Sequence, residues 1–240
     1  MNVSKDRPII GILCWELGFP RGLQQLEKMP GNVICPRTFD FPVRYERVQG
    51  ANFHTIVEEP STDALLAMIK AAQGMEKDGI RAITTSCGFN AIFQSELANS
   101  VSVPVFTSSL LQVPMVYRML GRGHWVGIIT AQKRFLTDKH LRETGIDRST
   151  PLCIEGLEDT GEWDRIHRRP EEEVDLRKLE KEIVQVGRRI VEKNQKTGAI
   201  VLECTDLPPF AKAIQKVTNL PVFDIVTLVK MVHEAVVKKG

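Results

Sequence analysis

The feature that most constrains the fold of this chain is an internal repeat in which a cysteine occupies the same place twice. Residues 82–111 and 199–228 align at a constant offset of 117 without gaps, and 8 of the 30 aligned positions are identical. In each copy an apolar run leads to a cysteine, Cys87 in the first and Cys204 in the second, and a Pro-Val-Phe segment begins 17 residues later. Two similar halves, each with one thiol in the same position, predict a site that is built between the halves.

The repeat extends upstream to a glycine-centred apolar segment. Residues 9–13 match residues 125–129 at an offset of 116, with Gly11 and Gly127 in the same place. Short apolar runs without regular alternation are typical of strands that are buried on both faces of a parallel sheet. The runs that we expect to be strands are 9–14, 33–34, 54–57, 82–85, 103–106, 125–130, 152–154, 199–202 and 222–224.

Helical patterns alternate with these strands, which is typical of a doubly wound α/β fold. Residues 63–78 and 171–195 carry apolar side chains at helical spacing, and Pro170 with three glutamates indicates where the second helix begins. Shorter helical segments, 91–99 and 210–217, follow the two cysteines.

We therefore expect two pseudo-symmetric α/β lobes, each a mostly parallel sheet flanked by helices, with the site in the cleft between them. The first lobe is expected to span residues 1–114 and to be joined by the C-terminal segment 210–240, and the second to span residues 115–209. No linker rich in glycine, proline or serine separates them, which predicts tight packing.

Composition excludes several classes of function. The net charge is +2, from 32 basic and 30 acidic residues, which gives no reason to expect nucleic acid or an anionic membrane as a partner. The N-terminus does not resemble a secretory signal, and no apolar run approaches the ~20 residues of a membrane span, so a cytoplasmic protein is expected. The five cysteines include no CxxC pair, and the five histidines have no metal-binding spacing. We expect no metal and read all five histidines as structural or solvated.

The two matched cysteines have a position that suits acid–base chemistry. Ligands of parallel α/β sheets bind at the carboxyl ends of strands, where Cys87 and Cys204 are expected. A helix that follows a cysteine favours the thiolate and lowers the thiol pKa. A carbon acid held between the two could lose a proton to one thiolate and regain it from the opposite thiol, without a cofactor.

Lone cysteines at strand ends are usually inert packing, and we read Cys14, Cys35 and Cys153 in this way. The polar, turn-forming neighbours of the matched pair favour a functional reading instead. Hydroxyl and backbone N–H donors near the two thiols would stabilise a developing enolate.

Two motifs, residues 85–90 (TSCGFN) and 203–208 (ECTDLP), resemble those of the aspartate/glutamate racemase superfamily, in its hydantoin racemase-like branch. The resemblance implies two pseudo-symmetric lobes with the substrate between them. It also implies a PLP-independent, cofactor-free mechanism with Cys87 and Cys204 as the two bases, and it makes Thr205 a ligand of a substrate carboxylate.

Three departures from the family pattern bear on the substrate. Gly88-Phe89 stands where amino-acid racemases usually have Asn-Thr, which favours hydantoin-type or other carbon acids. Asp206 stands where His or Glu is frequent, and an acid there could orient the Cys204 thiol. Cys14-Trp15-Glu16 replaces the Asp-Ser-Gly of glutamate racemases, so that either Glu16 replaces the acid or Trp15 forms a pocket wall.

The sequence thus predicts a racemase or epimerase, an isomerase of a small carboxylate-bearing or hydantoin-like carbon acid (amino acid, dicarboxylate or hydantoin), in a chain that forms a homodimer. A lyase, decarboxylase or cis–trans isomerase that uses one cysteine, and a non-catalytic small-molecule binding protein, are the alternatives. Arg37 is either a substrate carboxylate ligand or a surface residue. The substrate-binding candidates are Trp15, Thr85, Ser86, Gly88, Phe89, Asn90, Thr130, Thr205 and Asp206.

Overall fold

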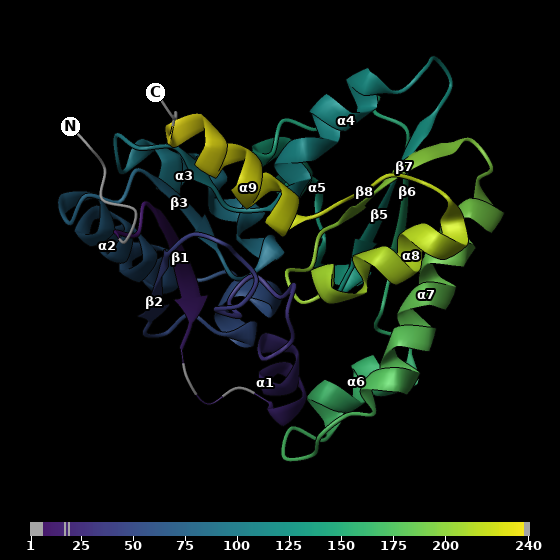
Figure 1. The fold of residues 1–240 in the computed structure, drawn as a ribbon, viewed down its shortest axis with the longest axis horizontal. Coiled ribbons are helices and arrows are strands. Elements are labelled where there is room, and N and C mark those ends of the chain that lie inside the picture. Colours follow the sequence, from purple (N-terminus) through teal and green to yellow (C-terminus); the bar gives the residue numbers. More distant parts are fainter. Residues whose placement is uncertain (1–6, 17, 19, 238–240) are drawn as a thin grey trace.

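The computed structural model describes residues 7–16, 18 and 20–237. The two ends of the expected first lobe, residues 1–6 and 238–240, therefore lie outside the described residues. The described chain forms two four-stranded parallel sheets, each flanked by helices, as predicted (Figure 1).

The two sheets have the same topology. The first sheet has the order β2-β1-β3-β4, and the second has the order β6-β5-β7-β8. The strands of the first sheet are β1 (Ile10–Trp15), β2 (Val43–Val48), β3 (Ala82–Thr85) and β4 (Val105–Phe106). Those of the second are β5 (Trp125–Thr130), β6 (Leu152–Gly156), β7 (Thr197–Leu202) and β8 (Val222–Phe223). The repeat seen in the sequence is therefore a repeat of topology, in which β1 corresponds to β5 and β3 to β7.

Nine α-helices are assigned within the described residues. They are α1 (Arg21–Glu27), α2 (Thr62–Lys77), α3 (Gln94–Asn99), α4 (Val113–Met119), α5 (Asp138–Glu143), α6 (Gly161–Arg168), α7 (Leu176–Lys193), α8 (Ala211–Thr218) and α9 (Ile225–Val236). Short 3-10 turns at Gly88–Phe93 and Pro208–Phe210 join the cysteine segments to α3 and α8.

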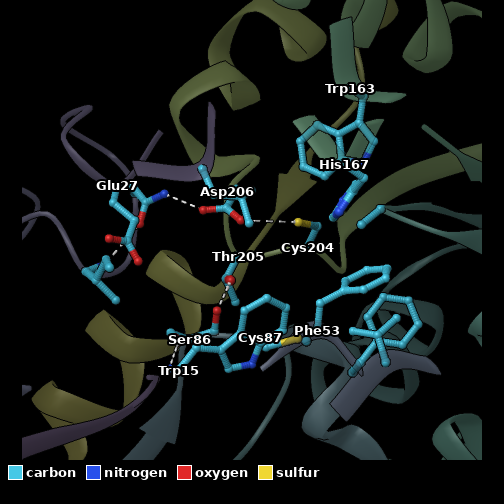
Figure 2. A pocket seen from close by; sticks show the side chains of 17 residues that line it. Trp15, Glu27, Phe53, Ser86, Cys87, Trp163, His167, Cys204, Thr205 and Asp206 are labelled. Atoms are coloured by element: carbon cyan, nitrogen blue, oxygen red, sulfur yellow. Dashed lines mark hydrogen bonds between the residues drawn. The ribbon is translucent and has the colours of Figure 1, made fainter. Parts of the chain in front are cut away.

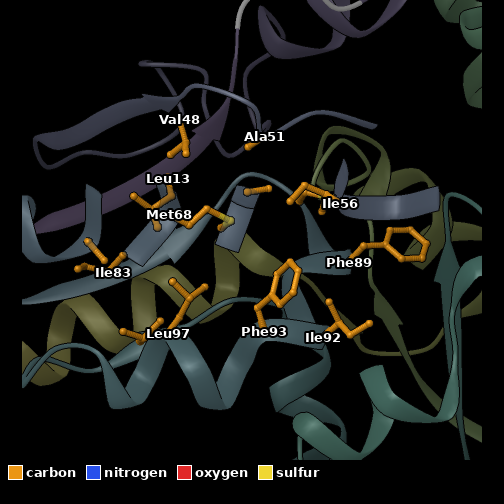
Figure 3. Close-up of a cluster of buried hydrophobic side chains, with 14 of the residues drawn as sticks. Leu13, Val48, Ala51, Ile56, Met68, Ile83, Phe89, Ile92, Phe93 and Leu97 are labelled. Carbon is orange, nitrogen blue, oxygen red and sulfur yellow. The ribbon is translucent and has the colours of Figure 1, made fainter. Parts of the chain in front are cut away.

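Each lobe has its own apolar core, which lies between its sheet and one long helix, α2 in the first lobe and α7 in the second. In the first lobe, Leu13 and Ile83 of the sheet pack with Met68 of α2 (Figure 3). In the second lobe, Ile129 and Ile200 pack with side chains of α7 that include Ile183 and Ile190. Cys87 belongs to the first core and Cys204 to the second, so each thiol lies where the core of its lobe meets the other lobe.

The repeated glycines at the centres of β1 and β5 are required by close helix packing. A Cβ on Gly11 would overlap Met75 of α2, and a Cβ on Gly127 would lie 2.8 Å from Cγ2 of Ile190 on α7. The same residue type is thus needed in both lobes because a helix approaches the same strand position.

The expected strands at 33–34 and 54–57 are wrong. Residues 33–34 lie in turns, and His54–Glu58 forms a π-helical turn. The missing strand is β2, an edge strand that pairs only with β1 and carries Arg44, Glu46 and Arg47. Its charged, half-exposed side chains hide it from a search for apolar runs. Likewise α7 begins at Leu176 instead of 171, because the Asp175 side chain accepts the N–H groups of residues 177 and 178 and so caps the helix.

Only the last part of the C-terminal segment 210–240 packs on the first lobe. The helix α8 packs on α7, and β8 pairs with β7, so both stay with the second lobe. The helix α9 then crosses to the first lobe, where Ile225 and Val229 pack with Ile10 and Ile12 (Figure 1). None of the helices that the structure describes has the length and apolar character of a membrane span.

The glycine requirement predicts opposite effects of two alanine substitutions. We expect Gly127→Ala to destabilise the protein by about 1–3 kcal/mol, because its Cβ would meet three side-chain atoms at 2.8–3.3 Å. Gly74→Ala in α2 is the matched control, since its Cβ would meet nothing within 4 Å and alanine stabilises a helix interior by about 0.5–1 kcal/mol. Urea denaturation measures both, and equal midpoints for the two variants would refute the packing argument.

Candidate active site

Both matched thiols open into one pocket between the lobes, with a volume of about 630 Å³ including its mouth. Cys87 follows β3 and Cys204 follows β7 after one intervening residue, so both come from carboxyl ends of central strands. Each is 8% exposed, and the two occupy different walls of the pocket (Figure 2). The predicted convergence of the two thiols is therefore present in the structure.

Cys87 lies at the start of a 3-10 turn. Some of its neighbours raise the pKa of its thiol, and others lower it. Burial and the nearby negative charge of Glu203 raise the pKa of the Cys87 thiol well above its ordinary value. The backbone N–H groups of Phe89 and Asn90 lie near the sulfur and oppose this rise, and the Asn90 N–H donates to the Cys87 carbonyl at 3.1 Å. A thiolate at Cys87 thus has two backbone donors available.

Cys204 has an acidic neighbour instead. Its Sγ lies 3.9 Å from Oδ2 of Asp206, and Asn32 donates to Oδ1 of the same carboxylate at 2.7 Å. Burial, followed by the negative charges of Asp206 and Glu203, raises the pKa of Cys204 well above its ordinary value. Burial also raises the pKa of Asp206 to about 6. Both thiols therefore favour the protonated form, and the backbone N–H of Asp206 opposes the rise at Cys204 as those of Phe89 and Asn90 do at Cys87.

The two cysteine segments contact each other directly. The Thr205 hydroxyl donates to the backbone carbonyl of Ser86, the residue before Cys87. A Cβ on Gly88, the residue after Cys87, would overlap the backbone oxygen and Oε1 of Glu203. Glycine at position 88 is therefore required by the approach of the opposite strand end, and this accounts for its departure from the family pattern.

Glu203 is a fully buried carboxyl group behind the two thiols. Its Oε2 accepts the Thr130 hydroxyl at 2.7 Å, and its carboxyl also accepts the Ala131 N–H, whereas Oε1 has no hydrogen-bond partner among the residues that the structure describes. Burial is the largest influence on this group and raises its pKa to about 7. Glu203 is therefore an ionisable group that changes its charge near neutral pH.

The pocket wall has an acidic corner and several aromatic side chains. Glu27 and Asp206 form the corner, and no lysine or arginine occurs among the described residues that line the pocket. Arg47 pairs with Glu27 at 3.3 Å from outside the lining, and burial raises the pKa of Glu27 to about 7. The aromatic residues of the wall are Trp15, Phe53, Phe89 and Trp163. The ring centroids of Trp15 and Phe53 are 6.5 Å apart in an edge-to-face arrangement.

The predicted substrate-binding residues divide into two groups. Trp15, Ser86, Gly88, Phe89, Thr205 and Asp206 line the pocket. Thr85, Asn90 and Thr130 are buried behind its wall, where Thr85 donates to the carbonyls of residues 87 and 107 and Thr130 to Glu203. Thr85 and Thr130 hold the cysteine segments by these bonds, and the role of all three residues as substrate ligands stays a prediction.

The alternatives left open at Trp15 and Glu16 are now distinguishable. Trp15 lines the pocket, whereas the Glu16 carboxylate accepts the Gly50 N–H at 2.9 Å and the Asn52 side-chain amide at 2.7 Å and so holds the loop after β2. Arg37 is exposed and donates to the Lys28 carbonyl.

His167 lines the pocket from α6, so for this histidine the expectation of a structural or solvated role stays a prediction. Its ring lies 4.5 Å from that of Phe53, and burial lowers its pKa, which favours the neutral imidazole. The sequence reading also missed Glu27, Asn32, Phe53 and Trp163, which come from elements without a cysteine motif. Among the described residues, no group of three or more His, Cys, Asp or Glu side chains is placed to hold a metal ion.

The profile of the Asp/Glu/Hydantoin racemase family matches residues 42–230, and the chain therefore belongs to this family. The allantoin racemase of Pseudomonas fluorescens has a similar fold, with a TM-score of 0.61 and 15% sequence identity over 94% of this chain and 89% of that chain. At this identity the likeness concerns the fold alone.

Curated relatives are more similar in sequence. A dimethylsulfoniopropionate lyase of Durusdinium sp. clade D is 29% identical over 204 residues, which is 82% of this chain and 67% of that protein. Dimethylsulfoniopropionate lyase 3 of Emiliania huxleyi is 30% identical over 231 residues, which is 92% of this chain and 58% of that protein. The chain thus spans only about three fifths to two thirds of the length of these relatives.

From the raised pKa of Glu203 we predict that the free energy of unfolding falls as pH rises. Its folded-state pKa of about 7 lies above the ordinary 4.5, so its contribution to stability is fully present below pH 4.5 and is lost as pH rises through about 7. Glu27 and Asp206 act in the same sense. We expect Glu203→Gln to be more stable relative to wild type at pH 8 than at pH 5, by up to roughly 3 kcal/mol.

Chemical denaturation at the two pH values measures this difference. Glu180→Gln, which replaces an exposed carboxyl on α7, is the control and is expected to leave the pH dependence unchanged. The idea fails if Glu203→Gln retains the full loss of stability between pH 5 and pH 8.

Proposed function

We propose that this protein is a cofactor-independent lyase that cleaves a small sulfonium carboxylate of the dimethylsulfoniopropionate type. The observation that carries the proposal is the pocket itself, in which two buried thiols meet an acidic, aromatic wall without lysine or arginine among its described residues. The similarity to curated dimethylsulfoniopropionate lyases over 82–92% of the chain supports the same substrate class.

The reaction requires only a base and a good leaving group. A thiolate removes a proton from the carbon next to the carboxylate, and the electron pair forms the new carbon–carbon double bond. The carbon–sulfur bond breaks, and its electron pair leaves with the neutral sulfide. Dimethylsulfoniopropionate would yield dimethyl sulfide, acrylate and one proton. Because the sulfonium group already carries a positive charge, no cofactor has to accept electrons.

Cys87 is the better candidate for the base. A thiolate there would be favoured by two backbone N–H groups, those of Phe89 and Asn90. A thiolate at Cys204 would have one such group, the N–H of Asp206, and would face the Asp206 carboxylate at 3.9 Å. Cys204 is then the thiol that keeps its proton on the opposite side of the substrate. General-base catalysis by such a group typically contributes about 10²–10⁴-fold.

The charge of the pocket wall favours a zwitterion over a dicarboxylate. A dicarboxylate would bring two negative charges beside Glu27 and Asp206, with no lysine or arginine in the described lining to compensate. A sulfonium group would instead be attracted by Asp206, by Glu27, whose charge Arg47 partly offsets, and by the faces of Trp15 and Phe53, since aromatic rings bind organic cations by about 0.5–2 kcal/mol. The substrate carboxylate would then lie near backbone N–H groups of the cysteine segments.

Racemisation is the second candidate, because two thiols in one pocket fit a two-base mechanism and an allantoin racemase shares the fold. It would use the same first step, the loss of a proton to one thiolate. Its second step would be the return of a proton from the opposite thiol, on a substrate without a leaving group.

The two candidates differ in their products. We expect the protein to release dimethyl sulfide, detected in the headspace, and acrylate, detected by NMR, from dimethylsulfoniopropionate. Cys87→Ser should lower kcat/KM by at least about 10²-fold. Cys153→Ser, at a half-buried thiol on β6 outside the pocket lining, is the matched control and should keep wild-type activity. Deuterium exchange into chiral amino acids or hydantoins, without sulfide release, would favour the racemase.

A second experiment tests the cation preference of the pocket. The inhibitors 3-(trimethylammonio)propionate and 4-methylpentanoate both carry a carboxylate and a branched end, but only the first has a cationic end. We expect the inhibitor with the cationic end to bind more tightly. Phe53→Leu should weaken its binding about 2- to 30-fold and should change the binding of 4-methylpentanoate, whose branched end is uncharged, only a little. Calorimetry measures all four constants, and equal losses for both inhibitors would indicate packing rather than charge recognition.

A further inference from the structure

The carboxyl group of Glu203 has no role in the reaction as proposed, although it lies behind both thiols. It is fully buried and is anchored through Oε2 to Thr130, and its Oε1 lacks a hydrogen-bond partner within the described part of the chain. Burying a polar atom without a partner is unfavourable, so this arrangement requires a reason.

The reason lies in the packing of Glu203 against Gly88. The backbone oxygen and Oε1 of Glu203 occupy the space that any Cβ at position 88 would need. The peptide of Gly88 connects Cys87 to the N–H groups of Phe89 and Asn90 that face its sulfur. The position of Glu203 therefore determines where these donors stand relative to the thiol.

We propose that Glu203 is a positioning residue for Cys87: it fixes the turn that carries this thiol, and its own negative charge opposes ionisation of the thiol. The inference rests on the proposed function in giving Cys87 the role of the base. A neutral Glu203 leaves Cys87 with its two backbone donors, whereas a charged Glu203 opposes a second negative charge beside it.

Other ionisable groups also lie near Cys87 and can influence its pKa besides Glu203. Asp206 and Cys204 face it from the segment after β7, and Asp206 acts on Cys87 less than Glu203 does. Glu27 from α1 and His167 from α6 line the same pocket. His140 of α5 packs edge-to-face on Phe89, and burial favours its neutral form by lowering its pKa to about 4.

Glu203 and Asp206 form a matched pair for an experiment. Glu203 is the first charge that acts on Cys87, and Asp206 is the first charge that acts on Cys204. Glu203→Gln and Asp206→Asn each remove one negative charge while keeping the size of the side chain. The larger effect of Glu203→Gln should therefore be on Cys87, and the larger effect of Asp206→Asn on Cys204.

The test measures alkylation of each thiol by iodoacetamide, from pH 6 to pH 10 and without substrate, with the Cys87 and Cys204 peptides resolved by mass spectrometry. In Glu203→Gln, we expect the alkylation rate of Cys87 at pH 8 to rise roughly three- to tenfold, and that of Cys204 to rise less, since one pKa unit is a tenfold change in thiolate fraction. In Asp206→Asn the order should be reversed.

Thr130→Val guards against a folding defect in Glu203→Gln. It removes the hydroxyl that stabilises the charged form of Glu203, so it should raise the reactivity of Cys87 by a smaller factor in the same direction. Unchanged Cys87 profiles in both variants, with circular dichroism like that of wild type, would overturn the inference.

The alkylation experiment is independent of the proposed reaction. If the protein releases no dimethyl sulfide but the Cys87 profile shifts as expected, the proposed substrate fails and the role of Glu203 stands. If sulfide is released and the profile does not shift, the lyase stands and the role of Glu203 fails. Where both hold, the pH optimum of Glu203→Gln moves to lower pH.

Discussion

The direct contact between the carboxyl ends of β3 and β7 is the constraint on which the site depends. Two central strands of separate sheets end against each other, and their loops meet closely enough that Gly88 has no room for a side chain beside Glu203. The Thr205 hydroxyl closes the same contact by donating to the Ser86 carbonyl. A parallel sheet directs the carboxyl ends of its strands to one edge, so two such edges placed face to face bring both thiols to one pocket.

At this contact the two thiols have different surroundings. Cys87 begins a turn whose N–H groups favour its ionised form, whereas Cys204 lies two residues before Asp206, whose carboxylate is 3.9 Å from the Cys204 sulfur. The scaffold is repeated, but the position before each cysteine is Ser86 in one copy and Glu203 in the other. Burial of Glu203 and Asp206 next to the thiols opposes folding at neutral pH, which is the usual relation between a functional site and stability.

Much of this arrangement could be predicted from the sequence because it lies in the repeat. The central strands, the position of Cys87 and Cys204 at their ends, and the two lobes follow from apolar runs and an offset. Of the aromatic and acidic wall, Trp15, Phe89 and Asp206 could be predicted from their place beside strand ends. Glu27, Phe53 and His167 could not, since they come from helices and turns that reach the pocket only after folding. One sequence signal could have identified Glu203. Its carboxylate stands between an apolar run and a cysteine, which is an unusual place for a charged residue unless it has a function.

The family fold does not by itself decide between racemisation and elimination, because both begin with a proton leaving a carbon next to a carboxylate. The fate of the resulting carbanion depends on the next carbon of the substrate. With no leaving group there, the carbanion must recover a proton, and a thiol on the opposite side such as Cys204 inverts the centre. With a sulfonium group there, departure of the sulfide competes with reprotonation, and the carbon that lost the proton carried two hydrogens, so return of a proton from either side leaves no trace. Under the proposed function, the pocket wall would select between these substrates, since the carboxylates of Glu27 and Asp206 would favour the cationic one.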